Sequence, residues 1–323
     1  MRVRFWGVRG SVPASLSPAQ VKERISAVVQ RIAPQDLVSA DSRERFLARL
    51  PGWLFGTAGG HTSCIEIGTE NRKTCLLLNA GTGLGAFSRE LERRASSADG
   101  SGFPEEVHIL LPEETPECTQ GIPFFFPLTR PETQVFFLRA ADHADGLENV
   151  LRPPFPGDSV LARNSGISAR VFQQTLPENG SSVYAGGAEI ICRHRAGNAC
   201  AFRITAGDSV LLYCAGAGLS APDLEDTEEN RTFFGGADAV ILDTACAYGE
   251  KRQTESGEKP GGLFAVDFAG RWDIRRLILF RHSPVCTDKT LHTVRQTAEA
   301  YQNYAFGGRI TVSVAAEEQE WIL

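Results

Sequence analysis

The chain has 323 residues, a formal net charge of −6 and 42% hydrophobic residues. This length allows a large core, and the ordinary globular composition with its negative charge argues against nucleic acid as the main partner. No apolar run approaches the roughly 20 residues that span a bilayer, and the N-terminus has no apolar signal core. With eight scattered cysteines, we expect a cytoplasmic protein with reduced thiols and no membrane partner.

The N-terminal region alternates like a strand over residues 2–6 and then continues into helical sequence. Ser17 is typical of a helix N-cap, with Pro18 in the first turn and Gln20 completing a capping box. A second short helix is expected from about Ser42 to Leu50. Because this helical pair lies between two strands, we interpret about 14–55 as a helical insertion within one domain that spans 1–323.

Strands resume at 62–67 and 75–78, and a glycine-rich turn leads into a helix from about 87 to 94. The strand at 107–111 runs into a short acidic loop that contains Glu113 and Glu117. In α/β proteins the loops just past the carboxyl ends of strands are where sites are built. The acidic loop is therefore the first candidate site. A strand at 134–138 and a helix at 140–151 follow.

The second half of the sequence reads mostly as strands, at 169–174, 189–192, 200–205, 210–214 and 239–242. The apolar run 277–280 is typical of a strand buried on both faces. A helix is expected at about 288–301 and a last strand near 309–314, while 220–235 and 249–262 read as polar loops. The pattern predicts an α/β protein in which two β-rich layers are covered by helices.

Four stretches, in this order, carry a likeness to a known family: Arg4–Pro13, Gly59–Cys64, Leu77–Leu84 and Gln120–Phe125. With them the chain resembles the metallo-β-lactamase-fold hydrolases, in particular a bacterial phosphodiesterase-like branch. The likeness covers nearly the whole chain. It implies a four-layer αββα sandwich of two mixed β-sheets flanked by helices, with metal sites formed by loops at one edge of the sheets.

In that family a His-x-His-x-Asp-His loop directly before the Gln-Gly block holds one or two divalent ions, which ionise a water for attack on an ester or phosphodiester. The resemblance implies that none of these ligands is kept. The positions of that loop hold Glu113, Thr115, Glu117 and Cys118. The later ligand positions fall at Arg195, Gly216 and Arg281, and Asn79 stands where an Asp is expected.

The two arginines change the chemistry of such a site. A guanidinium cannot deprotonate to coordinate a cation, and it would repel one. The sequence therefore predicts a vestigial site in which Arg195 and Arg281 face Glu113 and Glu117. An ion pair of that kind would hold the loops together where metal once sat.

Three functional hypotheses follow, and they leave open whether the protein is an enzyme. The first is a metal-free, catalytically inactive protein without a cofactor, retained for binding, regulation or assembly. The second is a phosphodiester or ester hydrolase with a rearranged zinc or manganese site. The third is a nucleotide or small-anion sensor that uses Arg195 and Arg281. The expected partner is a protein or a small anionic ligand. The rearranged site of the second hypothesis would use Glu113, Glu117, Cys118, His194, Asp243 and His282.

Overall fold

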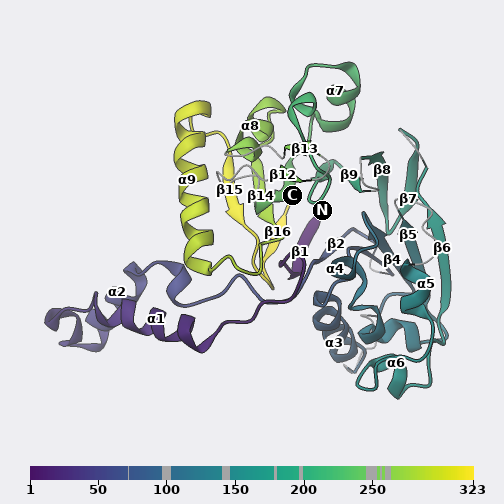
Figure 1. The fold of residues 1–323 in the computed structure, drawn as a ribbon, viewed down its shortest axis with the longest axis horizontal. Coiled ribbons are helices and arrows are strands. Elements are labelled where there is room, and N and C mark those ends of the chain that lie inside the picture. Colours follow the sequence, from purple (N-terminus) through teal and green to yellow (C-terminus); the bar gives the residue numbers. More distant parts are fainter. Residues whose placement is uncertain are drawn as a thin grey trace.

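The computed structural model describes residues 1–71, 73–96, 103–139, 146–177, 180–195, 199–244, 253–254, 257–258 and 263–323. In this part of the chain two seven-stranded β-sheets form the centre of the molecule, with helices on either side (Figure 1). Each sheet combines three antiparallel pairs with three parallel pairs. The two halves of the sequence thus build two sheets of the same design.

The first sheet contains the N-terminal strand and the strands of the first half, closed by the last strand of the chain. Its order is β16 (Glu320–Ile322), β1 (Arg2–Gly7), β2 (Cys64–Gly68), β3 (Thr74–Leu78), β4 (Glu106–Leu111), β5 (Gln134–Arg139) and β6 (Arg170–Thr175). The second sheet has the order β15 (Thr311–Val314), β14 (Arg276–Phe280), β11 (Ala239–Asp243), β10 (Ser209–Tyr213), β9 (Cys200–Ala206), β8 (Ala188–His194) and β7 (Ser182–Ala185). A separate two-stranded ladder joins β12 (Gln253–Thr254) to β13 (Gly257–Glu258).

The helices differ in length and position. They are α1 (Pro18–Val29), α2 (Ala40–Arg49), α3 (Gly83–Ala95), α4 (Pro116–Thr119), α5 (Gly146–Leu151), α6 (Val160–Arg163), α7 (Glu228–Phe234), α8 (Phe264–Arg271) and α9 (Asp288–Phe306). Short 3₁₀ turns are η1 (Pro34–Leu37), η2 (Gly52–Leu54), η3 (Ile122–Phe124), η4 (Phe126–Thr129) and η6 (Ala221–Leu224). None of the helices in the described part of the chain is long and apolar enough to cross a membrane.

The core is divided into three apolar layers because successive side chains of a strand point to opposite faces. Phe5 of β1 and Phe280 of β14 meet between the two sheets, with ring centroids 5.7 Å apart. On the outer face of the first sheet, Trp6 packs against Phe87 of α3. On the outer face of the second sheet, residues of β10, β11 and β14 pack against α8 and α9. The arrangement is the predicted αββα sandwich.

Several local predictions differ from the structure. Residues 220–235 were expected to be a loop, but they contain η6 and α7, and Phe233 and Phe234 of α7 are buried on the second sheet. Because the residues before Phe233 and Phe234 are polar, the sequence shows no helical pattern of apolar residues there. The predicted helix at 140–151 is described only from Gly146 onward, and most of 249–262 lies outside the described residues.

The helical insertion lies between β1 and β2, and Figure 1 shows α1 and α2 reaching away from the sheets. The predicted capping box is present, since Ser17 and Gln20 exchange hydrogen bonds at the start of α1. The buried Asp288 carboxylate at the start of α9 joins the insertion to the core. It accepts from the Ala58 backbone N–H at 2.8 Å and forms an ion pair with Arg24 of α1.

Beyond β1 the chain crosses from one sheet to the other. The backbone N–H groups of Val8 and Arg9 donate to His61 O, while that of Gly10 donates to His282 O at 2.9 Å. In return His282 N–H donates to Val8 O. This segment ties the two sheets together at the edge where β14 ends.

Candidate functional site

The candidate site is an ion-pair centre, which we call the Arg281 centre, formed by Glu113, Glu117, Asp243 and Arg281. Each residue follows or ends a strand that has a parallel neighbour: β4 for the two glutamates, β11 for Asp243 and β14 for Arg281. The carboxyl ends of these strands, from both sheets, therefore meet at one edge. The acidic loop lies at this edge, as its position after β4 predicted.

Glu117 has the most complete set of partners. Arg281 Nε donates to Oε1 at 2.7 Å and Nη2 donates to Oε2 at 2.9 Å. The Ser63 hydroxyl adds a bond to Oε1 at 2.9 Å, and the Ser11 backbone N–H adds one to Oε2 at 2.7 Å. A carboxylate offers about four acceptor sites on its two oxygens. Donors of this chain therefore occupy all the acceptor sites of Glu117.

These contacts determine the charge state of the pair. Burial alone would raise the pKa of Glu117, but the hydrogen bonds and charge of Arg281, with the Ser11 and Ser63 donors, hold that pKa below its ordinary value. Burial would likewise lower the pKa of Arg281, but Asp243, Glu117 and Glu113 raise it well above its ordinary value. Both side chains are charged at neutral pH.

The other two acids complete the surroundings of the guanidinium. Arg281 Nη2 lies 2.9 Å from Glu113 Oε1, and its Nε lies 3.8 Å from Asp243 Oδ1. Asp243 also accepts from the Gly216 backbone N–H at 2.9 Å. A Cβ at Gly216 would lie 1.9 Å from Arg281 Nη1, and the φ of +78° also favours glycine there. The glycine at this position lets the guanidinium lie directly against the backbone.

Three further residues of the predicted vestigial site lie nearby. Cys118 Sγ is 3.9 Å from Glu113 Oε1, and burial followed by the charge of Glu113 raises the pKa of this thiol. A protonated, buried thiol is a poor nucleophile. The Thr115 hydroxyl is buried without a hydrogen-bond partner among the described residues. Asn79, with φ of +63°, donates from Nδ2 to the Tyr213 hydroxyl at 2.7 Å.

Arg195 does not face Glu113 and Glu117, and the expectation that it would is corrected. It follows β8, where its two terminal nitrogens donate to the two oxygens of the buried Asp223 at 2.7 and 2.6 Å. Its Nε donates to Ala217 O at 3.2 Å. The sequence did not indicate that Asp223 would pair with Arg195, because Asp223 lies in the segment 220–235, which was expected to be a loop.

The structure brings together only part of the rearranged metal set. Glu113, Glu117 and Asp243 surround Arg281, with Cys118 beside Glu113, but the two histidines do not join them. His282 is fully buried, with Nε2 2.8 Å from Ala315 O and Nδ1 2.6 Å from the Thr244 hydroxyl. Because a carbonyl only accepts, Nε2 carries the proton and Nδ1 accepts from Thr244. Burial lowers the pKa of His282 to about 4, so the ring is neutral and both nitrogens are engaged. His194 lies near Cys192 and Cys200 instead.

A divalent ion at the Arg281 centre would have to take its ligands from carboxylates that already surround the guanidinium. The side chain of Arg281 is 16% exposed and that of Glu117 is 5% exposed, so the pair is largely shielded from water. Within the described part of the chain, the only group of three or more His, Cys, Asp or Glu suited to holding a metal is Cys192, His194 and Cys200. The donor set of the Arg281 centre does not fit a catalytic metal.

Sequence reasoning missed two parts of this region. Ser11 and Ser63 lie within two of the family-like stretches, but nothing in the sequence marks them as donors to Glu117. The cluster of Cys192, His194 and Cys200 was missed as well. Its signal was present, because Cys192 and His194 alternate at the end of one strand and Cys200 begins the next.

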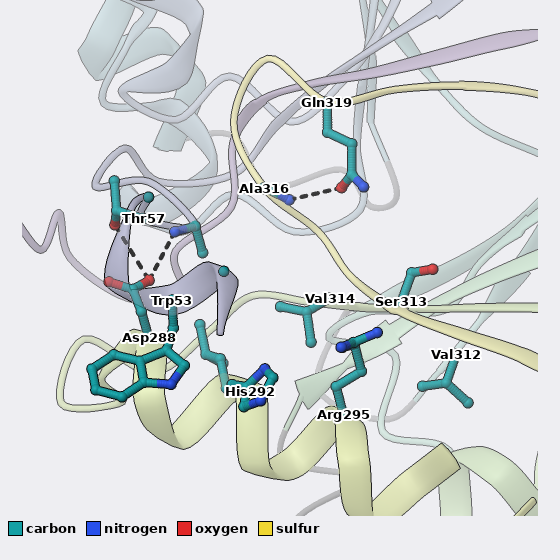
Figure 2. A pocket seen from close by; sticks show the side chains of 14 residues that line it. Trp53, Thr57, Asp288, His292, Arg295, Val312, Ser313, Val314, Ala316 and Gln319 are labelled. Carbon is teal, nitrogen blue, oxygen red and sulfur yellow. Dashed lines mark hydrogen bonds between the residues drawn. The ribbon is translucent and has the colours of Figure 1, made fainter. Parts of the chain in front are cut away.

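A separate cleft of about 380 Å³ lies between the insertion, α9 and the segment that joins β15 to β16 (Figure 2). Its lining includes the aromatic ring of Trp53, the imidazole of His292 and the guanidinium of Arg295. The Asp288 carboxylate also lines it, but is already bonded to Thr57 and Ala58. Both size and mixed lining are typical of small-molecule sites.

No protein-family model matches the sequence, and no curated protein matches it either. Solved structures do resemble it along its whole length. The metallo-β-lactamase-fold protein YhfI from Bacillus subtilis has a TM-score of 0.58 and 14% identity, over 99% of this chain and 98% of that one. Zn²⁺-bound PqqB from Methylobacterium extorquens has a TM-score of 0.54 and 15% identity, over 100% of both chains.

A diphosphatase of the PhnP family is also similar, with a TM-score of 0.52 and 10% identity over 100% of this chain and 97% of that one. Identities this low establish the fold alone. The chain has the metallo-β-lactamase fold, as its sequence predicted, and the fold's relatives include hydrolases.

Proposed function

We propose that this metallo-β-lactamase-fold protein lacks metal-dependent hydrolase activity at the Arg281 centre and acts as a binding or regulatory protein. The observation that supports this most strongly is the occupancy of Glu117, whose acceptor sites are all taken by Arg281, Ser11 and Ser63. A catalytic ion needs ligands with open lone pairs and an open position for water.

Displacing the guanidinium would not restore such a site. Arg281 would remain charged close to the incoming cation, because its pKa is raised well above an already high value. Gly216 stands at a position where the resemblance implies a metal-bridging Asp, and its backbone lies against Arg281. Gly216 and Arg281 therefore fit each other, because the missing side chain at Gly216 leaves room for the guanidinium.

The test is hydrolysis of a bis(p-nitrophenyl) phosphate probe by the full chain, with zinc or manganese added in steps. We expect the rate to equal that of buffer with metal, for the wild type and for Glu117→Gln alike. Metal-dependent turnover in the wild type that Glu117→Gln removes would overturn the proposal. Glu23→Gln, which removes one partner of an exposed ion pair with Lys289, is the matched control.

For the binding role we propose that the cleft of Figure 2 accepts a small anionic ligand. Arg295 and His292 on α9 line it together with Trp53, and Lys289 Nζ lies 5.7 Å from the centre of the Trp53 ring. A cation beside an aromatic wall suits a planar or phosphorylated anion. Arg295 is paired with Glu299 at 2.8 Å, so a ligand would compete with that carboxylate.

Thermal unfolding with inorganic phosphate and with a nucleoside monophosphate tests this role. A ligand at about one hundred times its dissociation constant stabilises the native state by about 2.7 kcal/mol. We expect a rise in Tm that Arg295→Gln abolishes. Arg309→Gln, which removes an exposed guanidinium 3.8 Å from Asp273, should keep it. No rise with either probe, or an equal rise in Arg295→Gln, would exclude this cleft as the anion site.

A further inference from the structure

A cluster of two cysteines and one histidine lies where β8 ends and β9 begins. Cys192 and His194 belong to β8, and Cys200 begins β9 directly opposite His194 in the antiparallel register. One ligand atom from each residue lies within 4.8 Å of the others. Because residues two apart on a strand share a face, Cys192 and His194 point to the same side of the sheet.

The surroundings of the cluster are those of a built site. Cys192 is 1% exposed and Cys200 0%. His194 Nε2 is buried and has no hydrogen-bond partner among the residues that the structure describes. A buried imidazole nitrogen without a partner is unfavourable, and two thiols next to it offer only weak donors or acceptors. A cation that binds both sulfurs and the imidazole would satisfy all three groups.

We infer that Cys192, His194 and Cys200 bind a zinc ion. In tetrahedral zinc sites Zn–S is about 2.3 Å and Zn–N about 2.0–2.1 Å, which places neighbouring ligand atoms about 3.5–3.8 Å apart. The ligand atoms of the cluster, all within 4.8 Å of one another, are at most about 1.3 Å farther apart than that geometry requires. Two thiolates and an imidazole form a soft donor set, which selects zinc over magnesium or calcium. The fourth position is left to an exogenous ligand such as water.

This site uses other residues than the Arg281 centre. Its ligands lie on β8 and β9, while the Arg281 centre is built after β4, β11 and β14. The two are linked structurally, because the Cys200 backbone N–H donates to Pro112 O at 3.1 Å, just before Glu113. Arg195, which follows His194, donates its backbone N–H to Ala199 O at 2.8 Å. Zinc would thus fix the hairpin end that holds Arg195 against Asp223.

The experiment measures metal in the full chain, purified under reducing conditions without chelator. We expect stoichiometric zinc in the wild type and in Cys75→Ala, which removes a buried thiol of the first sheet. Removing one ligand, as in Cys192→Ala or His194→Gln, should lower the zinc affinity at least about tenfold. Glu117→Gln should leave it unchanged. Zinc that is lost in Glu117→Gln but retained in Cys192→Ala would place the metal at the Arg281 centre and overturn this assignment.

Cobalt substitution provides a second readout that does not depend on the variants being equally stable. Co²⁺ bound by thiolates gives an intense charge-transfer band in the near ultraviolet. We expect this band in the wild type and in Cys75→Ala, a weaker band in Cys200→Ala, and a fall in Tm when a chelator is added to the wild type. A wild-type chain that binds neither metal when its thiols are reduced, or that joins Cys192 to Cys200 in a disulfide instead, would overturn the inference.

Discussion

Arg281 and Glu117 form an ion pair with two parallel hydrogen bonds across the edge where the two sheets meet, at 2.7 and 2.9 Å. The two residues are far apart in sequence and follow strands of different sheets. Bidentate geometry of this kind is a property of arginine that lysine does not share. The pair therefore balances the charge of Glu117 and joins one sheet to the other.

Breaking this pair on one side should destabilise the fold. Arg281→Met leaves the Glu117 carboxylate buried without its cation, and we expect the free energy of unfolding to fall by about 3 kcal/mol. Glu117→Gln should have a smaller effect, because the amide keeps part of the hydrogen bonding. Urea unfolding measures the difference. Glu23→Gln at the exposed pair with Lys289 should change stability by less than about 0.5 kcal/mol. If Arg281→Met and Glu23→Gln lost the same stability, the structural role of Arg281 would be contradicted.

Gly216 offers a test of the packing of the guanidinium. Gly216→Ala places a methyl group 1.9 Å from Arg281 Nη1, whereas Gly218→Ala, also at positive φ, meets nothing within 4 Å. Both variants share the strain of a left-handed alanine, about 1–3 kcal/mol. We expect Gly216→Ala to lose at least about 1 kcal/mol more than Gly218→Ala.

The extra loss at Gly216 should disappear in the Arg281→Ala background, because the clash then has no partner. Urea unfolding of the four variants in this cycle gives the interaction energy directly. Additive effects of Gly216→Ala and Arg281→Ala would show that the two residues do not touch.

His282 should make stability depend on pH. Its pKa is lowered to about 4 in the folded state, first by burial and then by the nearby Arg9, against the opposing effects of the Ala315 hydrogen bond and Asp288. The unfolded chain, with an ordinary histidine pKa near 6.5, therefore binds more protons below that pH. Stability is full above about pH 6.5 and falls as the pH decreases toward 4, by up to about 1.4 kcal/mol per pH unit.

Urea unfolding between pH 4.5 and 7.5 measures this effect as the difference between the wild type and His282→Gln. The lower limit of pH 4.5 avoids the range in which protonation of Glu117 also lowers stability. The pKa of Glu117 is lowered in the folded state, so the stabilisation by this carboxylate is lost only as the pH falls below its ordinary pKa of 4.5. A pH slope that is the same in both proteins would show that His282 is not buried as a neutral ring.

Asp288 should control how firmly the helical insertion is held. Asp288→Asn removes the charge that binds Arg24 and weakens the acceptor for the Ala58 N–H. We expect limited proteolysis to cleave within 14–55 several times faster in this variant than in the wild type, because local opening of the insertion becomes easier. Asp41→Asn, in the first turn of α2, is the control. Equal cleavage rates in all three proteins would show that other contacts hold the insertion.

The two sheets and most helices could be predicted because their signals are local. The capping box of Ser17 and Gln20 and the apolar run of β14 depend on neighbours in sequence, and both are found in the structure. The position of Glu117 after a strand likewise predicted an edge site. By contrast, α7 was missed because Phe233 and Phe234 are surrounded by polar residues and find their apolar partners only in the second sheet.

The sequence by itself determined most strands and helices and the absence of imidazoles from the acidic loop, since periodicity, capping and residue type are properties of short segments. The four-layer arrangement was implied by the likeness to a known family. Only the tertiary structure decided which charges pair, because that depends on which strand ends meet. It assigned Arg281 to Glu117 and Arg195 to Asp223, although the sequence offered both arginines to the same loop. The same holds for Cys192, His194 and Cys200, which become one cluster only through the register of β8 on β9.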